Sequence, residues 1–283
     1  MAPGIIRVAT YNLRGSKLDE GTLNSWDHRK NILYKSIEHI DPSIIGTQEG
    51  NPSQLNDILT NLTLKDSNKW KMIGKIIDDH ETINAIFYRA DEFDYKKTGT
   101  FWFNEHPEEA GAAWGAKNSK GCTWAEFFNI KNHDEKFVHY NLHLEWPRPL
   151  ARKNSIPILL QYIEKQHPNE QNLIVTGDFN NWPEEVEGII PTDELIQLGE
   201  ICPEVIQMKE ANFVDTFLVA NPNSPNVPTF NGFRKEGYGP KIDFVYIKKD
   251  TFHVKNAAVC EYQENENFPS DHFAVYADLQ YKK

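Results

Sequence analysis

The sequence predicts an α/β protein in which two β-sheets pack face to face and helices cover their outer sides. Short apolar runs typical of strands recur along the chain, segments with helical spacing lie between them, and the two halves repeat a similar strand–helix–strand order. A sheet with an apolar face must bury it against another layer, so two such halves suggest two packed sheets. We expect residues 1–283 to form a single domain, because no linker, repeat or low-complexity segment divides them.

The elements of the first half follow from apolar spacing and from breaker residues. A helix is indicated by apolar residues at helical spacing, which are Ile32, Leu33, Ile37 and Ile40. Asp41 and Pro42 end that helix, because a residue before proline avoids helical backbone angles. The predicted order is a strand at 5–11, a helix at 26–40, a buried strand at 44–48, a helix at 52–62, strands at 70–77 and 83–88, and aromatic stretches at 101–103 and 124–130.

The second half begins with an apolar strand and a helix within 150–166. We expect Pro157 in the first turn of this helix, just after Ser155, because proline is tolerated where the backbone N–H has no helical partner. The predicted order is a strand at 137–143, that helix, a strand at 173–177, an irregular helical region at 184–210, and strands at 242–248, 252–260 and 273–279.

The formal net charge of −11 bears on the kind of partner. Proteins that grip nucleic acid without sequence preference usually carry a basic face, because release of counterions from phosphates drives that binding. The charge therefore argues against a large nucleic-acid footprint. It leaves room for a small site, since part of the acidity could belong to a cation-binding cluster.

Composition also bears on the compartment. No apolar run approaches the roughly 20 residues needed to span a bilayer, and the chain enters a strand too early for a signal peptide. The cysteines Cys122, Cys202 and Cys260 have neither metal-ligand spacing nor the pattern of a disulfide framework. We expect buried thiols in a reducing compartment and a cytoplasmic protein, although a trimmed secreted precursor would look the same.

Six stretches place polar or charged side chains at or near strands. Five lie where an apolar strand begins or ends: "IIRVAT" before Tyr11-Asn12, "SIIGT" before Gln48-Glu49, "VHYNLHLEW" with His143, "LIVTG" before Asp178-Phe179-Asn180, and Asp271-His272 before "FAVYADL". Loops at strand ends can aim such side chains at one point. The sixth, Asp243 in "KIDFVYI", is expected inside a strand, where a carboxylate is costly unless it is paired or bound to a cation.

Each of these residues has an ordinary explanation when taken alone. Asn12 could cap a turn, Glu49 could be a surface carboxylate, and His143 could be a core histidine with a satisfied hydrogen bond. Asp178 and Asn180 could form an Asx turn. All of these explanations would have to hold together across the whole chain, which makes a shared site the better interpretation.

Taken together, the motifs resemble the endonuclease/exonuclease/phosphatase superfamily, which includes deoxyribonuclease I. They occur in the family order from residue 7 to about 279: "TYNLR", "GTQEG", "YNLHLE", "TGDFN", "KIDFVYI" and "SDHFAV". The resemblance implies a four-layer αββα sandwich with two mixed sheets. It also implies a hydrolase of phosphoric esters that uses Mg2+ or Mn2+, hard cations that suit carboxylate oxygens and phosphoryl chemistry.

The resemblance implies metal ligands on three strand-end segments. Glu49 is the first candidate ligand, with Asn12 beside it, and Asp271 is a further one. A second cation could bind near Asp178 and Asn180. The number of metals is left open.

The resemblance also assigns catalytic roles. Asp178 would orient or deprotonate the attacking water, and Asn180 would position it. His272 would pair with Asp243, which fixes the imidazole tautomer and raises its basicity. His143 would donate a hydrogen bond to a phosphoryl oxygen in the transition state.

Contacts to the remainder of the substrate are less specific in sequence. Arg152 could bind a phosphate, Trp124 could stack on a base, and Asn231 stands where many relatives have a histidine. Glu81 is a further candidate in the site, as a carboxylate partner for His143. Signatures of the inositol-polyphosphate 5-phosphatase and sphingomyelinase branches are absent from the corresponding stretches.

Three functions are therefore compared. The first is hydrolysis of a phosphodiester in a nucleic acid or nucleotide, with single-stranded nucleic acid as a possible partner and a monomer as the expected state. The second is a phosphomonoesterase acting on a small sugar phosphate, nucleotide or inositol phosphate. The third is a catalytically silent binding scaffold, which has no need of intact Glu49, Asp178, Asn180, Asp243 and His272.

Overall fold

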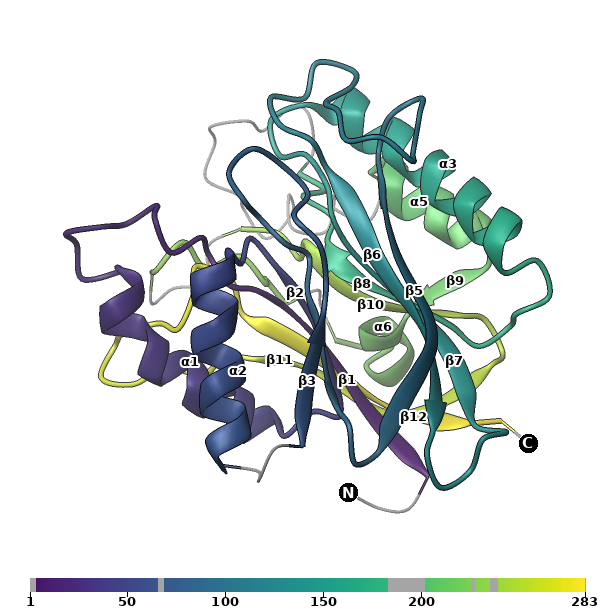
Figure 1. Ribbon diagram of the computed structural model, residues 1–283, viewed down its shortest axis with the longest axis horizontal. Helices are drawn as coiled ribbons and strands as arrows, with labels where there is room; N and C mark the ends of the chain where they lie inside the picture. Colours follow the sequence, from purple (N-terminus) through teal and green to yellow (C-terminus); the bar gives the residue numbers. More distant parts are fainter. Residues whose placement is uncertain (1–3, 66–68, 183–201, 225–226, 235–238, 283) are drawn as a thin grey trace.

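The computed structural model describes residues 4–65, 69–182, 202–224, 227–234 and 239–282. Two mixed six-stranded sheets lie face to face, with helices on their outer sides (Figure 1). The strand order is β11-β12-β1-β2-β4-β3 in the first sheet and β5-β6-β7-β8-β10-β9 in the second. The four-layer αββα sandwich expected from the sequence is confirmed.

The first sheet is formed by both ends of the chain. Its N-terminal elements are β1 (Ile5–Asn12), α1 (Trp26–Ile40), β2 (Ile44–Gln48), α2 (Pro52–Lys65), β3 (Trp70–Ile73) and β4 (Ile86–Arg89). Its last two strands are β11 (Phe252–Cys260) and β12 (Ala274–Tyr281). Strand β1 pairs antiparallel with β12 and parallel with β2, so the last strand of the chain lies beside the first.

The second sheet is formed by the middle of the chain. Its elements are β5 (Phe93–Trp102), β6 (Gly121–Asn129), β7 (Lys136–His143), α3 (Pro149–Gln166), β8 (Leu173–Asp178), α5 (Pro203–Glu210), β9 (Phe213–Asp215), α6 (Thr216–Ala220) and β10 (Asp243–Lys248). Helices α1 and α2 lie beside the first sheet, and α3 and α5 lie on the far side of the second (Figure 1).

Three apolar clusters fill the spaces between the four layers. One lies between the sheets and includes Val8, Phe137 and Val245. A second joins α1 and α2 to the first sheet, and a third joins α3 and α5 to the second. Because strand side chains alternate between faces, each sheet contributes to the central cluster and to one outer cluster.

The inner faces of the strands become polar towards one end of the sandwich. Along β7 the inward residues are Phe137, His139, Asn141 and His143, which changes from apolar to ionisable along one strand. Buried hydrogen bonds link this polar middle layer to the other sheet, for example from Gln48 Nε2 to Asn141 Oδ1 at 2.7 Å. A side chain at Gly46 would run into the same layer, at Asn141 and the Thr176 hydroxyl.

Several predicted details are corrected by the structure. Helix α3 begins at Pro149, so Pro157 lies inside the helix and not in its first turn. Asp243 is the first residue of β10 and does not lie inside the strand, and β3 ends at Ile73. Of the helical region expected at 184–210, residues 184–201 lie outside the described part of the chain, and α5 accounts for most of the rest.

Two further predictions concern the thiols and membrane-spanning segments. All three cysteines are buried, as expected. Within the described ranges, none of the helices combines the length and the apolar character that crossing a bilayer requires.

Candidate active site

Strand ends from both sheets meet at one end of the sandwich. In the second sheet, β7 runs parallel to β8 and aligns His143 with Asp178, while β10 runs antiparallel to β8 and aligns Asp243 with Asp178. In the first sheet, Asn12 ends β1, and Glu49 follows β2, which runs parallel to β1. The chain therefore brings residues that lie far apart in sequence to one edge of each sheet.

Asn12 joins the two sheets at this end. Its amide nitrogen lies 3.2 Å from Oε1 of Glu49 and 2.9 Å from Oδ2 of Asp178, and it donates to both. Its own Oδ1 accepts from the backbone N–H of Arg14 at 2.9 Å. The second oxygen of Glu49 accepts from the N–H of Gly15 at 3.0 Å. Asn12 thus fixes the two carboxylates relative to each other.

His272 is held by a buried carboxylate. Its Nδ1 lies 2.9 Å from Oδ2 of Asp243, and its Nε2 lies 3.8 Å from Oδ2 of Asp178. The N–H groups of Asp243 and Ile242 are both satisfied by the Thr229 hydroxyl. Asp243 therefore fixes the tautomer, with a proton on Nδ1 and Nε2 facing the cluster.

Asn180 connects Asp178 to His143. Its backbone N–H donates to Oδ1 of Asp178 at 2.9 Å, and its side-chain amide donates to Nε2 of His143 and to the carbonyl of Leu144. Asn180 has a positive φ of 47°, and Glu49 has a φ of 64°. Such left-handed angles are uncommon outside glycine and concentrate at functional sites.

The pKa values of the central groups are perturbed in ways that suit proton transfer. Burial and the neighbouring Asp243 carboxylate raise the pKa of Asp178 to about 7. Burial acts to lower the pKa of His272, but Asp243 and Asp178 outweigh it and raise that pKa to about 10. Burial lowers the pKa of His143 well below its usual value, so this ring is neutral. The site thus holds one charged and one neutral imidazole beside a carboxyl that titrates near neutrality.

Glu49 stays ionised in spite of its burial. Burial would raise its pKa, but the His143 and His272 rings, together with N–H donors from Gly15 and Asn12, lower the pKa to about 2. Since His143 is neutral near pH 7, the charge that favours ionised Glu49 is that of His272. A carboxylate held ionised in a buried place is a suitable cation ligand.

A sequence model of the Endonuclease/Exonuclease/phosphatase family matches residues 9–272 of this chain. The chain belongs to that family. A crystal structure of an endonuclease/exonuclease/phosphatase family protein from Bacteroides thetaiotaomicron is 26% identical, has a TM-score of 0.80, and aligns over 99% of this chain and 98% of the other. A mannosyl-6-phosphatase from the same bacterium is also 26% identical, with a TM-score of 0.80 over 98% of this chain and 100% of its own. The human Nocturnin catalytic domain shares the fold at 18% identity and a TM-score of 0.71, over 99% of this chain and 95% of that domain.

The donor set of this family member fits a hard divalent cation. Asp178, Asp243 and His272 each have a ligand-type atom within 4.8 Å of the others, although the protonated His272 ring has no free lone pair, so the oxygens come from the carboxylates. Oδ1 of Asp243 is buried and has no hydrogen-bond partner within the described residues. The half-buried Glu49 and the buried Asp271 add further carboxylate oxygens. Clustered carboxylate oxygens are the ligands that Mg2+ and Mn2+ prefer.

Asp271 brings an arginine into the site that the sequence analysis did not assign. Arg14 Nη1 lies 3.2 Å from Oδ2 of Asp271, and Arg14 also pairs with Asp19 at 2.9 Å. Burial raises the pKa of Asp271, and Arg14 opposes that shift. The signal was present in the sequence, because Arg14 follows Asn12 by two residues in "TYNLR".

Two of the candidates for substrate contact are corrected. Trp124 belongs to the outer apolar cluster beneath α3, on the face of the second sheet that points away from the site. Arg152 is buried, pairs with Glu204 at 3.0 Å and donates to the carbonyls of Trp146 and Trp182. Both side chains are committed to the protein interior and have no surface to offer a substrate.

The two remaining candidates also lie apart from direct substrate contact. Asn231 is buried; its amide donates to the carbonyl of Ser270 and its Oδ1 accepts from Phe233, so it supports the segment before Asp271. Glu81 has a side chain that is 57% exposed and pairs with Lys17 at 3.6 Å, so it is not the expected partner of His143.

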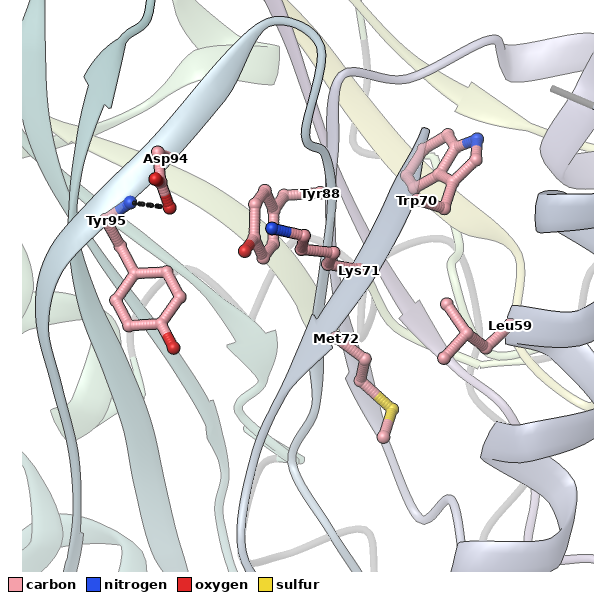
Figure 2. A pocket seen from close by; sticks show the side chains of 7 residues that line it. All are labelled: Leu59, Trp70, Lys71, Met72, Tyr88, Asp94 and Tyr95. Carbon is pink, nitrogen blue, oxygen red and sulfur yellow. Dashed lines mark hydrogen bonds between the residues drawn. The ribbon is translucent and has the colours of Figure 1, made fainter. Parts of the chain in front are cut away.

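A groove of about 500 Å³ lies elsewhere, between the edge strands β3 and β5 (Figure 2). Its walls are Leu59, Trp70, Lys71, Met72, Tyr88, Asp94 and Tyr95. None of these belongs to the strand-end cluster, so the groove is not part of the candidate active site.

Proposed function

We propose that this family member is a divalent-cation-dependent phosphoesterase that uses water to cleave a phosphate ester at the strand-end cluster. The observation that carries the proposal is the pair of contacts at Asp178 and His272. A carboxyl that titrates near neutrality lies 3.8 Å from an imidazole that Asp243 keeps protonated. A carboxyl with a pKa near neutrality beside an imidazole with a much higher pKa gives a base and an acid at the same pH, which acid–base catalysis needs.

The cation would be held by Glu49 and Asp271, with Asn12 orienting Glu49. When bound, Mg2+ or Mn2+ supplies charge neutralisation at the phosphoryl oxygens and helps to ionise the attacking water. Metal binding to the purified protein measures which cation the site holds and how many.

The side chains supply the remaining steps. Asp178 accepts a proton from the attacking water, and its pKa of about 7 lies near the working pH, which suits a general base. Asn180 holds Asp178 through its backbone N–H and keeps it in that position. His272, protonated at Nε2, donates a hydrogen bond to the phosphoryl group as negative charge develops there.

Two kinds of ester are candidates. The phosphodiester of a nucleotide or nucleic acid was the first expectation from the sequence. Two observations favour a phosphomonoester on a small sugar: the similarity to a mannosyl-6-phosphatase over essentially both full chains, and the net charge of −11, which disfavours long polyanions. We therefore infer that a sugar phosphomonoester is the better substrate.

Hydrolysis assays test both parts of the proposal. The enzyme should cleave p-nitrophenyl phosphate with Mg2+ or Mn2+, lose that activity in EDTA, and regain it when the cation is restored. Asp178→Asn should lower kcat by about 100-fold or more, because a general base contributes on that order. Asp134→Asn is the matched control, since Asp134 is exposed in the turn between β6 and β7 at the other end of β7.

A substrate panel separates the alternatives. Mannose 6-phosphate, single-stranded RNA and DNA, mononucleotides and inositol phosphates should be compared by kcat/KM. A preference for RNA or DNA would contradict the sugar phosphomonoester and leave the reaction type standing. Activity that persists in EDTA, or in Asp178→Asn, would contradict the mechanism itself, and no activity on any ester would favour a silent scaffold.

A further inference from the structure

Arg29 is a fully buried arginine close to the candidate site. It lies in the first turn of α1, is 2% exposed, and packs its guanidinium 5.1 Å from the centre of the Trp26 ring. Burying a charged side chain costs free energy unless its N–H donors form hydrogen bonds within the protein. Its contacts show what this side chain does.

The guanidinium binds the loops that carry two of the site residues. Nη1 donates to the carbonyl of Leu13 at 2.7 Å and to that of Pro269 at 2.9 Å. Nη2 donates to the carbonyl of Arg14 and Nε to that of Asn24. Leu13 and Arg14 directly follow Asn12, and Pro269 lies two residues before Asp271. One side chain therefore spans both loops.

A second hydrogen bond joins the same two loops. The Ser270 hydroxyl donates to the carbonyl of Asn12 at 2.7 Å. The last pair of the β1–β12 ladder is Thr10 and Val275. Beyond it, this bond and the two hydrogen bonds of Arg29 Nη1 link the end of β1 to the segment before β12. Without Arg29, the side-chain contacts left between these two loops among the described residues would be this hydroxyl bond and the ion pair of Arg14 with Asp271 at 3.2 Å.

Arg152 is a second buried arginine, which binds loops at the end of the other sheet. It also donates to carbonyls on two site loops, those of Trp146 after β7 and Trp182 after β8. Its charge is neutralised by Glu204 at 3.0 Å. Arg29 has no such carboxylate: among the residues described, its hydrogen bonds go to carbonyl oxygens alone. Only a planar guanidinium can serve several carbonyls in this way, and a lysine ammonium cannot reproduce the fork.

We propose that Arg29 is a positioning residue, which holds the loop after β1 and the loop before β12 so that Glu49, oriented by Asn12, and Asp271 share one cation. The inference rests on the proposed function and extends it to a side chain that touches neither cation nor substrate. Groups that orient ligands from behind in this way typically change metal affinity about 10-fold to 100-fold when they are removed.

Direct metal binding tests the proposal. Mn2+ binding to the purified, metal-free protein is measured by electron paramagnetic resonance, without any substrate. We expect Arg29→Met and Arg29→Lys each to weaken Mn2+ binding by about 10-fold or more, because neither can bridge the two loops. The control is Arg7→Met at the opposite end of β1, where Arg7 binds Asp278 and the carbonyl of Ile40. It should lose stability and bind Mn2+ as the wild type does.

The outcomes separate this inference from the proposed function. Each variant is first shown by urea unfolding to be folded under the binding conditions, and Arg29→Lys serves if Arg29→Met does not fold. Wild-type affinity for Mn2+ in a folded Arg29 variant would overturn the inference and leave the proposed function intact. Tighter binding would also overturn it, because removing a nearby positive charge would then matter more than the positions of the loops. Absence of Mn2+ binding and of hydrolysis in the wild type would overturn both.

Discussion

Asp243 illustrates, at the scale of single residues, how one buried carboxylate sets the chemistry of its neighbour. The charge of Asp243 and its hydrogen bond at 2.9 Å are among the causes that raise the pKa of His272 to about 10 against the effect of burial. Asp243 also acts on Asp178, whose pKa it raises. One side chain therefore raises the pKa values of both a base and an acid that lie 3.8 Å apart.

Asp243→Asn should impair the chemical step more than substrate binding. The amide keeps the size of the side chain but removes the charge that holds the proton on His272. We expect kcat to fall by about 100-fold or more, with a much smaller change in KM, because Asp243 lies behind His272. Steady-state kinetics with p-nitrophenyl phosphate and saturating Mg2+ measure both constants, with the exposed Asp134→Asn as the control. A kcat within about threefold of the wild type would show that His272 needs no charged partner.

Among the helices and strands, the sequence predicts the polar side chains at strand ends but not the side chains that support them. Asn12, Glu49, Asp178 and Asp271 each adjoin an apolar strand, so the chain itself marks them. The alternation along β7 was visible too, although the sequence analysis used only its last member, His143. Their meeting at one end follows from strand pairing, which no single segment specifies.

Burial of charged side chains depends on contacts between distant segments, and there the sequence analysis failed. Arg152 was considered as a phosphate ligand, but its guanidinium is enclosed by Glu204 and by loops after β7 and β8. Arg29 was not predicted as a site residue. Its partners are backbone carbonyls, which every residue type carries, so no sequence motif marks them. Pro157 was predicted in the first turn because a helix interior disfavours proline. The helix instead begins one stretch earlier, with Pro149 in its first turn and Pro157 in its interior.

The polar layer between the sheets should make stability depend on pH through His139. This ring is fully buried on β7, its Nε2 lies 2.7 Å from the Thr176 hydroxyl, and burial lowers its pKa to about 3. The unfolded chain binds a proton near pH 6.5 and the folded chain does not, so the stabilisation is complete above pH 6.5 and is lost as pH falls towards 3. The loss is about 1.4 kcal/mol per pH unit, or about 2 kcal/mol between pH 6.5 and pH 5.

Urea unfolding at several pH values measures this contribution. His139→Gln, which cannot gain a proton, should flatten the fall in the free energy of unfolding between pH 6.5 and pH 5. His133→Gln is the control, since His133 is exposed in the turn after β6 and should keep the wild-type slope. Equal slopes in wild type and His139→Gln would mean that other groups cause the acid sensitivity.

At the scale of the whole molecule, the distribution of charge matters more than any single pair. The net charge is −11, and the site itself gathers the half-buried Glu49 and the buried carboxylates Asp178, Asp243 and Asp271. A phosphate ester must approach this field against long-range repulsion, which a bound cation relieves only nearby. The chain thus combines a negative net charge with a proposed site for a phosphate ester, which suits a small substrate that can enter the local field of the cation.

Salt dependence should reveal this balance. Added salt shortens the screening length from about 30 Å at 0.01 M to about 8 Å at 0.15 M, so repulsion of the substrate weakens. With Mg2+ held saturating, kcat/KM for p-nitrophenyl phosphate should rise or stay level as NaCl increases over this range. The rise should be smaller for bis-p-nitrophenyl phosphate, which carries one negative charge where the monoester carries about two. An enzyme that grips nucleic-acid phosphates through a basic surface would instead lose affinity steeply, because salt competes with counterion release. A steep fall in kcat/KM with salt on single-stranded RNA, together with a high activity on it at low salt, would show that a local basic surface outweighs the net charge and would return the phosphodiester to first place.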